Sequence, residues 1–134
     1  MKFGIDLDGT LDARPWLFNQ MMREWISNGH EVIVVTGTFE GPALCSIEDK
    51  ERQLSRQATK DAGTNVSFLR NIHYTDIVLV VGEGATPEEM FKGVYRLKGE
   101  ACHERKIDMF FENDHLAAWE VKRRAPHTQV VQML

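Results

Sequence analysis

Two carboxylates at the end of the first hydrophobic segment are the chemically most suggestive feature of the sequence. Asp6 and Asp8 are separated by one residue, and Gly9 and Thr10 follow them directly. Carboxylates at this spacing after a strand can converge on one cation or play two roles in one reaction. Gly9 would allow a sharp turn that Thr10 could cap. An isolated Asp-x-Asp is usually a solvated turn, but here Asp-Leu-Asp-Gly-Thr-Leu ends a hydrophobic strand, which favours a functional site.

Short β-branched or aromatic segments alternate with helical patterns along the chain, and these elements must position the carboxylates. We expect strands at residues 3–7, 31–36, 77–81 and 107–111, with a weaker one at 129–132. We expect helices from Pro15 to about Gly29, from Ser46 to about Gly63, from Pro87 to about Arg105, and from Leu116 to Arg124. Two glycines inside the third helical region, Gly93 and Gly99, predict that it is interrupted.

Alternating strands and helices predict an α/β fold. We expect a single Rossmann-like three-layer α/β/α domain over residues 1–134, with a mostly parallel sheet. The segments at 31–36 and 77–81 are continuously apolar, as in strands that helices cover on both faces. In such sheets ligands bind beyond the carboxyl ends of the strands. The residues of interest are therefore 6–10, 36–38, 82–86 and 112–114.

Composition narrows the classes of function. The longest apolar run, residues 77–81, is too short to span a bilayer, so we expect no membrane partner. The net charge of −4 disfavours a general polyanion binder. Two cysteines cannot form a disulfide framework, and we expect a cytoplasmic protein.

Four stretches, in order, resemble the motifs of the haloacid dehalogenase-like (HAD) hydrolase superfamily. Residues 3–11 resemble the first motif, residues 32–37 the second, Lys98 the third, and residues 107–114 the fourth. The resemblance covers most of the chain and implies a HAD-like fold. The intervals after the first motif and between residues 82 and 97 are too short for an inserted domain, so the chain would lack a cap domain.

The resemblance implies a Mg²⁺-dependent phosphomonoester hydrolase, that is, a phosphatase. Asp6 would be the nucleophile that forms an aspartyl-phosphate, and Asp8 would be the general acid and base. Thr36 would donate a hydrogen bond to a phosphoryl oxygen, and Lys98 would neutralise charge in the transition state. Lys92 and Lys106 are alternative candidates for this role, but the spacing to the fourth motif favours Lys98.

The same resemblance implies a ligand set. Mg²⁺ would be bound by Asp6, by the backbone carbonyl of Asp8, and by an acid of the fourth motif. The family usually has Asp-Asp or Gly-Asp at that motif, whereas this chain has Glu112-Asn113-Asp114. Glu112 directly follows the strand and is preferred, while a shift of one residue would place Asp114 there instead. The expected substrate-binding residues are Gly9, Thr10 and Gly37.

The substrate class stays open among nucleotides, polynucleotide ends, sugar phosphates and other phosphate esters. Without a cap, the protein would take a large phosphorylated partner or cover its open site by forming a homo-oligomer. Residues 38–46 and the helix after them are the remaining material for substrate contacts. The alternative is a catalytically inactive HAD-fold protein that binds a metal or a phosphorylated partner. A response-regulator receiver is excluded because Gly82-Glu83 stand where it needs an aspartate, and a glycosyltransferase would need a longer chain.

Overall fold

The computed structural model describes residues 1–133, which form one α/β domain around a five-stranded parallel sheet of order β3-β2-β1-β4-β5. The strands are β1 (Lys2–Asp6), β2 (Glu31–Phe39), β3 (Asp76–Gly82), β4 (Met109–Glu112) and β5 (Gln129–Gln132). The helices are α1 (Pro15–Ser27), α2 (Ile47–Ala62), α3 (Pro87–Glu104) and α4 (His115–Arg124). An irregular turn, η1 (Leu7–Leu11), links β1 to α1. Every strand pair is parallel, which confirms the expected sheet.

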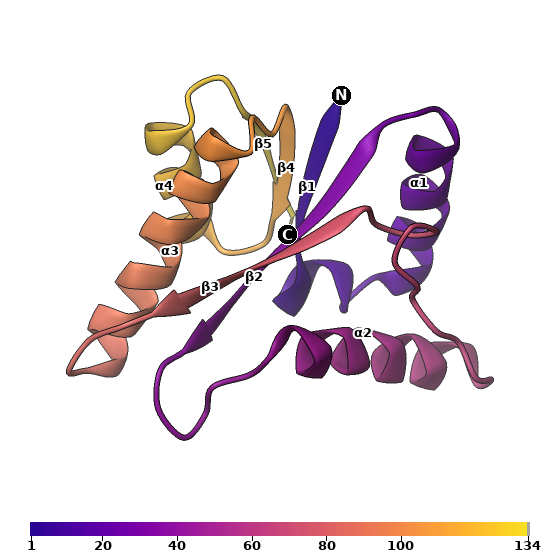
Figure 1. The fold of residues 1–134 in the computed structure, drawn as a ribbon, viewed down its shortest axis with the longest axis horizontal. Helices are drawn as coiled ribbons and strands as arrows, with labels where there is room; N and C mark the ends of the chain where they lie inside the picture. Colours follow the sequence, from indigo (N-terminus) through magenta and orange to yellow (C-terminus); the bar gives the residue numbers. More distant parts are fainter. Residues whose placement is uncertain (134) are drawn as a thin grey trace.

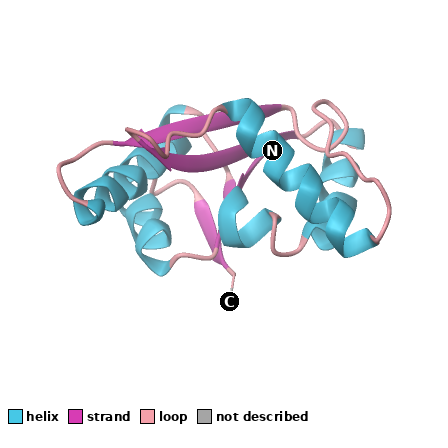
Figure 2. Cartoon of the chain, turned by 90° about the horizontal axis from the view of Figure 1, so that it is seen from below, coloured by secondary structure: helices cyan, strands magenta, loops and turns pink. Residues whose placement is uncertain are grey.

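Helices lie on both sides of the sheet, with α1 and α2 on one side and α3 and α4 on the other (Figure 1). Successive side chains of β2 point alternately to the two faces of the sheet. Val32 and Val34 belong to the core under α1 and α2, whereas Ile33 and Val35 belong to the core under α3 and α4. This explains the continuous apolar run and confirms three layers. Figure 2 shows that the sheet is strongly twisted, because its long and short strands run in clearly different directions.

The ends of α2 follow local signals in the sequence. The Ser46 hydroxyl accepts a hydrogen bond from the Asp49 backbone amide, and the Asp49 carboxylate accepts one from the Ser46 amide. This reciprocal pair is a capping box. Gly63 ends the helix with φ of 69°, a left-handed conformation that glycine adopts without strain.

Helix α3 corrects the expectation of a break, because it runs without interruption from Pro87 to Glu104. Its two glycines lie beside neighbouring backbone instead. Gly93 lies against the backbone of Gly82 and Glu83, and a Cβ at Gly99 would lie 3.0 Å from the carbonyl oxygen of Glu120 in α4. Close approach of the α4 backbone explains glycine at position 99, whereas a Cβ at position 93 would make only ordinary contacts.

The connections from β1 to α1 and from β3 to α3 contain no inserted domain within residues 1–133, as expected for a chain without a cap. No helix in this described part is long and apolar enough to cross a membrane.

Candidate functional site

The site lies where β1 and β4 end side by side. Asp6 is the last residue of β1 and Glu112 is the last residue of β4. The chain adds β2 and β3 on one side of β1, and β4 and β5 on the other. The order in which strands are added therefore reverses direction between β1 and β4. A reversal of this kind opens a crevice at the carboxyl ends of the central strands, which is the usual ligand position in this architecture.

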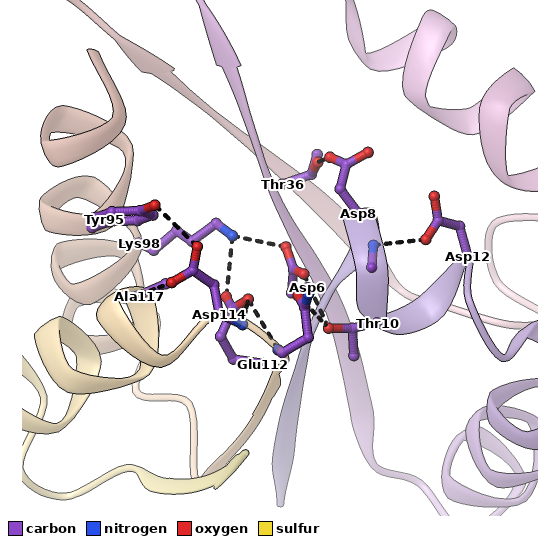
Figure 3. Close-up of polar contacts among 12 residues, drawn as sticks. Asp6, Asp8, Thr10, Asp12, Thr36, Tyr95, Lys98, Glu112, Asp114 and Ala117 are labelled. Carbon is purple, nitrogen blue, oxygen red and sulfur yellow. Dashed lines mark hydrogen bonds and ion pairs between the residues drawn. The ribbon is translucent and has the colours of Figure 1, made fainter. Parts of the chain in front are cut away.

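A buried lysine joins the two strand ends. The Lys98 ammonium, from α3, lies 2.7 Å from Oδ1 of Asp6 and 3.1 Å from Oε2 of Glu112 (Figure 3). All three residues are buried, with Asp6 1% exposed and Glu112 0% exposed. Lys98 lies in the second half of α3. Its long side chain carries the charge to the strand ends.

Burial sets the protonation of this cluster. Burial raises the pKa of Asp6 to about 8, and the neighbouring Glu112 adds to the rise while Lys98 opposes it. Burial disfavours the charge of Lys98, but the two carboxylates outweigh that effect and raise its pKa. Lys98 therefore stays charged at neutral pH, while Asp6 readily holds a proton.

Thr10 has a place in the same network. Its hydroxyl lies 3.0 Å from Oδ2 of Asp6 and 3.1 Å from Oδ1 of Asn113. One hydroxyl proton serves only one acceptor at a time. A proton on Asp6 lets both bonds form, because Asp6 then donates to Thr10 and Thr10 donates to Asn113. This agrees with the raised pKa of Asp6.

The Asp8 side chain points away from this cluster toward α2. It accepts hydrogen bonds from the Thr36 hydroxyl at 3.2 Å, the Lys50 ammonium at 2.9 Å and the Gln53 amide at 2.5 Å. Burial alone would raise the pKa of Asp8, but the bonds from Gln53 and Lys50 hold it below its usual value. Gly9, with φ of 82°, makes the turn between the two acids, and any Cβ there would collide with Asn113.

These groups border a pocket of about 400 Å³. One wall is polar and carries Asp6, Asp8, Lys50, Lys98, Glu112, Asn113 and Asp114. The aromatic and apolar part of the lining, called the aromatic wall below, consists of Phe39, Phe91, Val94 and Tyr95. The loop before α2 completes the lining with Thr38, Ala43 and Cys45.

Only one of the residues expected to bind substrate or to hydrogen-bond a phosphoryl group lines this pocket. Gly37 lines the pocket, as expected, but Gly9, Thr10 and Thr36 do not. Thr10 and Thr36 are fully buried, and their hydroxyls are hydrogen-bonded to Asp6 and Asp8, respectively. The ligand roles of all four residues stay predictions.

The expected Mg²⁺ ligands were Asp6, the backbone carbonyl of Asp8, and either Glu112 or Asp114, and the side chains of these four acids do not converge. Asp114 caps α4, accepting from the amides of Leu116 and Ala117, and it also accepts from the Tyr95 hydroxyl at 3.0 Å. Asp8 faces α2, and Lys98 stands between the other two carboxylates. Within residues 1–133, no three His, Cys, Asp or Glu side chains are placed to hold a metal ion. The donor set as arranged does not fit a preformed metal centre, and Mg²⁺ binding stays a prediction.

Sequence reasoning named residues 38–46 and the helix after them as candidates for substrate contacts, but it did not single out Lys50 of α2, and it missed Phe91 and Tyr95 of α3. Lys50 falls in line with Leu54 and Ala58 at four-residue spacing, and all three are buried. A lysine on the apolar stripe of a helix was the available signal. Phe91 and Tyr95 gave no such signal, because their place at the pocket depends on how α3 packs.

Comparison with known proteins gives the class of fold. No family model matches the sequence, and no curated protein matches it. A crystal structure of a universal stress protein in complex with cAMP aligns with a TM-score of 0.55 and 17% identity, covering 99% of this chain and 95% of that one. A universal stress protein family member from Burkholderia pseudomallei aligns at a TM-score of 0.47 and 17% identity, over 98% and 94% of the two chains. At this identity the likeness shows the fold alone.

These comparisons correct the interpretation drawn from the motifs. The solved structure that aligns at a TM-score of 0.55 is a universal stress protein, so the assignment to the HAD hydrolases was wrong, and the interpretation as an enzyme, a phosphatase acting through an aspartyl-phosphate, falls with it. The physical reason is that parallel α/β folds collect acids at the carboxyl ends of their strands whatever their function. A buried Asp6 that holds a proton near neutral pH is also a poor nucleophile.

Proposed function

We propose that the pocket binds a nucleotide whose phosphate carries a single negative charge. The observation that carries this proposal is that one pocket of about 400 Å³ is lined both by aromatic and apolar side chains and by charged and polar ones. Small-molecule sites have volumes of roughly 300–1,000 Å³ and combine apolar surface with a few fixed polar groups. A nucleotide needs both walls, since its base stacks on aromatic rings and its phosphate takes hydrogen bonds and positive charge.

Phe91 provides the free aromatic surface. Its ring packs edge-on against Phe39, with centroids 4.7 Å apart, and 46% of the residue is exposed. The ring of Tyr95 lies one turn further along α3, 6.2 Å from that of Phe91. Stacking of a base on such a ring is worth about 1–3 kcal/mol. The base therefore belongs on this wall.

The charges of the polar wall limit how much negative charge the bound phosphate group can carry. Lys50 is paired with Asp8, and Lys98 is paired with Asp6 and Glu112, so each cation is already largely compensated. The pocket carries four acidic side chains, of which Asp6 readily holds a proton, and only these two lysines. A phosphate monoester with two charges meets repulsion here, whereas a phosphodiester with one charge meets less. The cAMP in the crystal structure of similar fold is a phosphodiester, which supports this choice.

Calorimetric titration of the chain with cAMP and with 5′-AMP tests the proposal. cAMP is expected to bind more tightly than 5′-AMP, and Phe91→Ala is expected to weaken cAMP binding by about 5-fold or more through lost stacking. Leu17→Ala, which truncates an equally exposed apolar residue on α1, is the matched control and should leave binding unchanged. Absence of binding by either nucleotide at millimolar concentration would overturn the proposal.

We further propose that Mg²⁺ binds only together with a phosphorylated ligand. The excess of carboxylates in the pocket attracts a divalent cation, but the side chains as placed do not supply three ligands by themselves. Phosphate oxygens would complete the oxygen-rich surroundings that Mg²⁺ prefers. Mg²⁺ alone should therefore give no binding heat, while Mg²⁺ should strengthen 5′-AMP binding more than cAMP binding. Equal effects on the two nucleotides would refute this coupling.

A further inference from the structure

A second hollow of about 500 Å³ lies between α3 and α4, next to the nucleotide pocket. Its lining includes Gly93, Tyr95 and Arg96 of α3, and Leu116, Trp119 and Arg124 of α4. Tyr95 lines both hollows, so the two adjoin at this residue of the aromatic wall. The two helices run side by side in Figure 1, and they approach closely at Gly99.

Trp119 is the principal aromatic surface of this groove. The residue is 57% exposed, and Leu116, one turn earlier on α4, is 50% exposed. The Arg123 guanidinium lies over the indole, 5.2 Å from the ring centroid. An exposed indole beside arginine is a platform on which a nucleobase stacks with an added cation–π contribution.

The charges of the groove indicate how much phosphate it accepts. Three acids, Glu83, Glu89 and Glu120, and three bases, Lys92, Arg96 and Arg124, line it. Arg124 is also paired with Glu120 at 2.7 Å. A balanced groove on a chain of net charge −4 does not attract a long polynucleotide, but it tolerates one phosphodiester.

We infer that the ligand is a dinucleotide, with its first nucleoside in the pocket at Phe91 and its second base stacked on Trp119. The single phosphodiester that joins the two nucleosides would pass Tyr95, the residue that the two hollows share. This inference rests on the proposed nucleotide binding and extends it from one base to two.

Titration with the dinucleotide adenylyl-(3′→5′)-adenosine, compared with cAMP, tests the inference. The dinucleotide is expected to bind between about 5- and 150-fold more tightly than cAMP, which corresponds to one additional stacked base. Trp119→Ala should remove this excess and leave cAMP binding unchanged. Trp16→Ala is the matched control, because Trp16 is an exposed tryptophan on α1, and it should change neither affinity.

The outcomes separate the inference from the proposal on which it depends. If cAMP binds and the dinucleotide binds no more tightly, the second subsite is refuted and the nucleotide pocket stands. If neither ligand binds, both are refuted. If sedimentation shows a dimer that Trp119→Ala dissociates, with dinucleotide affinity unchanged, the groove is a contact between copies of the chain and the inference fails.

Discussion

Lys98 holds the buried polar cluster together. Its ammonium is the one group that compensates both Asp6 and Glu112, which come from strands separated by about a hundred residues of sequence. A carboxylate in a dry environment is costly unless a charge and hydrogen bonds satisfy it. The stability of the strand ends therefore depends on this side chain.

Replacing Lys98 by methionine should lower the free energy of unfolding by about 3–5 kcal/mol, since it leaves two buried carboxyl groups without a cation. Urea denaturation measures the loss. The triple variant Asp6→Asn, Lys98→Met, Glu112→Gln removes all three charges and should recover most of it. A triple variant as unstable as Lys98→Met alone would show that packing, and not charge, dominates.

The raised pKa of Asp6 predicts a pH dependence of stability. Between the unfolded value of 3.8 and the folded value of about 8, the folded chain binds more protons at this group than the unfolded chain. Its contribution to stability is therefore complete below pH 3.8 and is lost as pH rises toward 8. Asp6→Asn lacks this titration, so its stability relative to the native chain should increase from pH 5 to pH 8. A constant difference over that range, measured by urea denaturation, would contradict the raised pKa.

At the scale of elements, α3 supplies more lining residues than any other element, among them Phe91, Tyr95 and Lys98 from successive turns. The helix lies close to the sheet because glycines occur where backbone approaches backbone. Gly82, at the end of β3, faces the Met90 carbonyl, and a Cβ there would lie 2.2 Å from that oxygen. The placement of the aromatic wall thus depends on residues that never touch the ligand.

Two glycine replacements distinguish a glycine that is required by close packing from one that only lowers helix propensity. Gly93→Ala places a Cβ no closer than 3.5 Å to its neighbours and should stabilise the chain by about 0.5–1 kcal/mol through helix propensity. Gly82→Ala forces β3 and α3 apart and should cost about 1–3 kcal/mol. Thermal and urea unfolding report both. Destabilisation of similar size by the two variants would show that α3 is looser than its contacts indicate.

At the scale of the whole molecule, ligand binding at the sheet edge should stabilise the fold by mass action. A nucleotide at one hundred times its Kd raises the free energy of unfolding by about 2.7 kcal/mol. At the same concentration, a tenfold weaker Phe91→Ala variant should gain only about 1.4 kcal/mol. Denaturation with and without cAMP measures both. Equal gains would place the nucleotide elsewhere on the molecule.

A covering homo-oligomer, expected from the open site, stays a prediction at this scale. Sedimentation of the full chain with and without nucleotide tests it. Association that increases when the pocket is filled would support it, and a monomer under both conditions would exclude it.

The sequence by itself determined the elements and the parallel sheet, because hydrophobic periodicity, capping residues and turn glycines act over a few residues. Five strands and four helices appear near their expected places, and the acids Asp6 and Glu112 fall at strand ends as predicted. The preference for Lys98 over Lys92 and Lys106 rested on spacing alone, yet it selected the lysine that reaches both acids.

Only the tertiary structure decided what those residues do together. The direction of Asp8 toward Lys50, the cap formed by Asp114, and the aromatic wall at Phe91 depend on how α2, α3 and α4 are rotated against the sheet. Helix rotation follows from packing across the whole core, which no local pattern contains. For the same reason, the short acidic motif at the end of β1 led to a wrong prediction of the reaction. The motif determines only which acidic groups follow the strand. Burial and neighbouring charges determine the protonation of these groups and their hydrogen-bond partners.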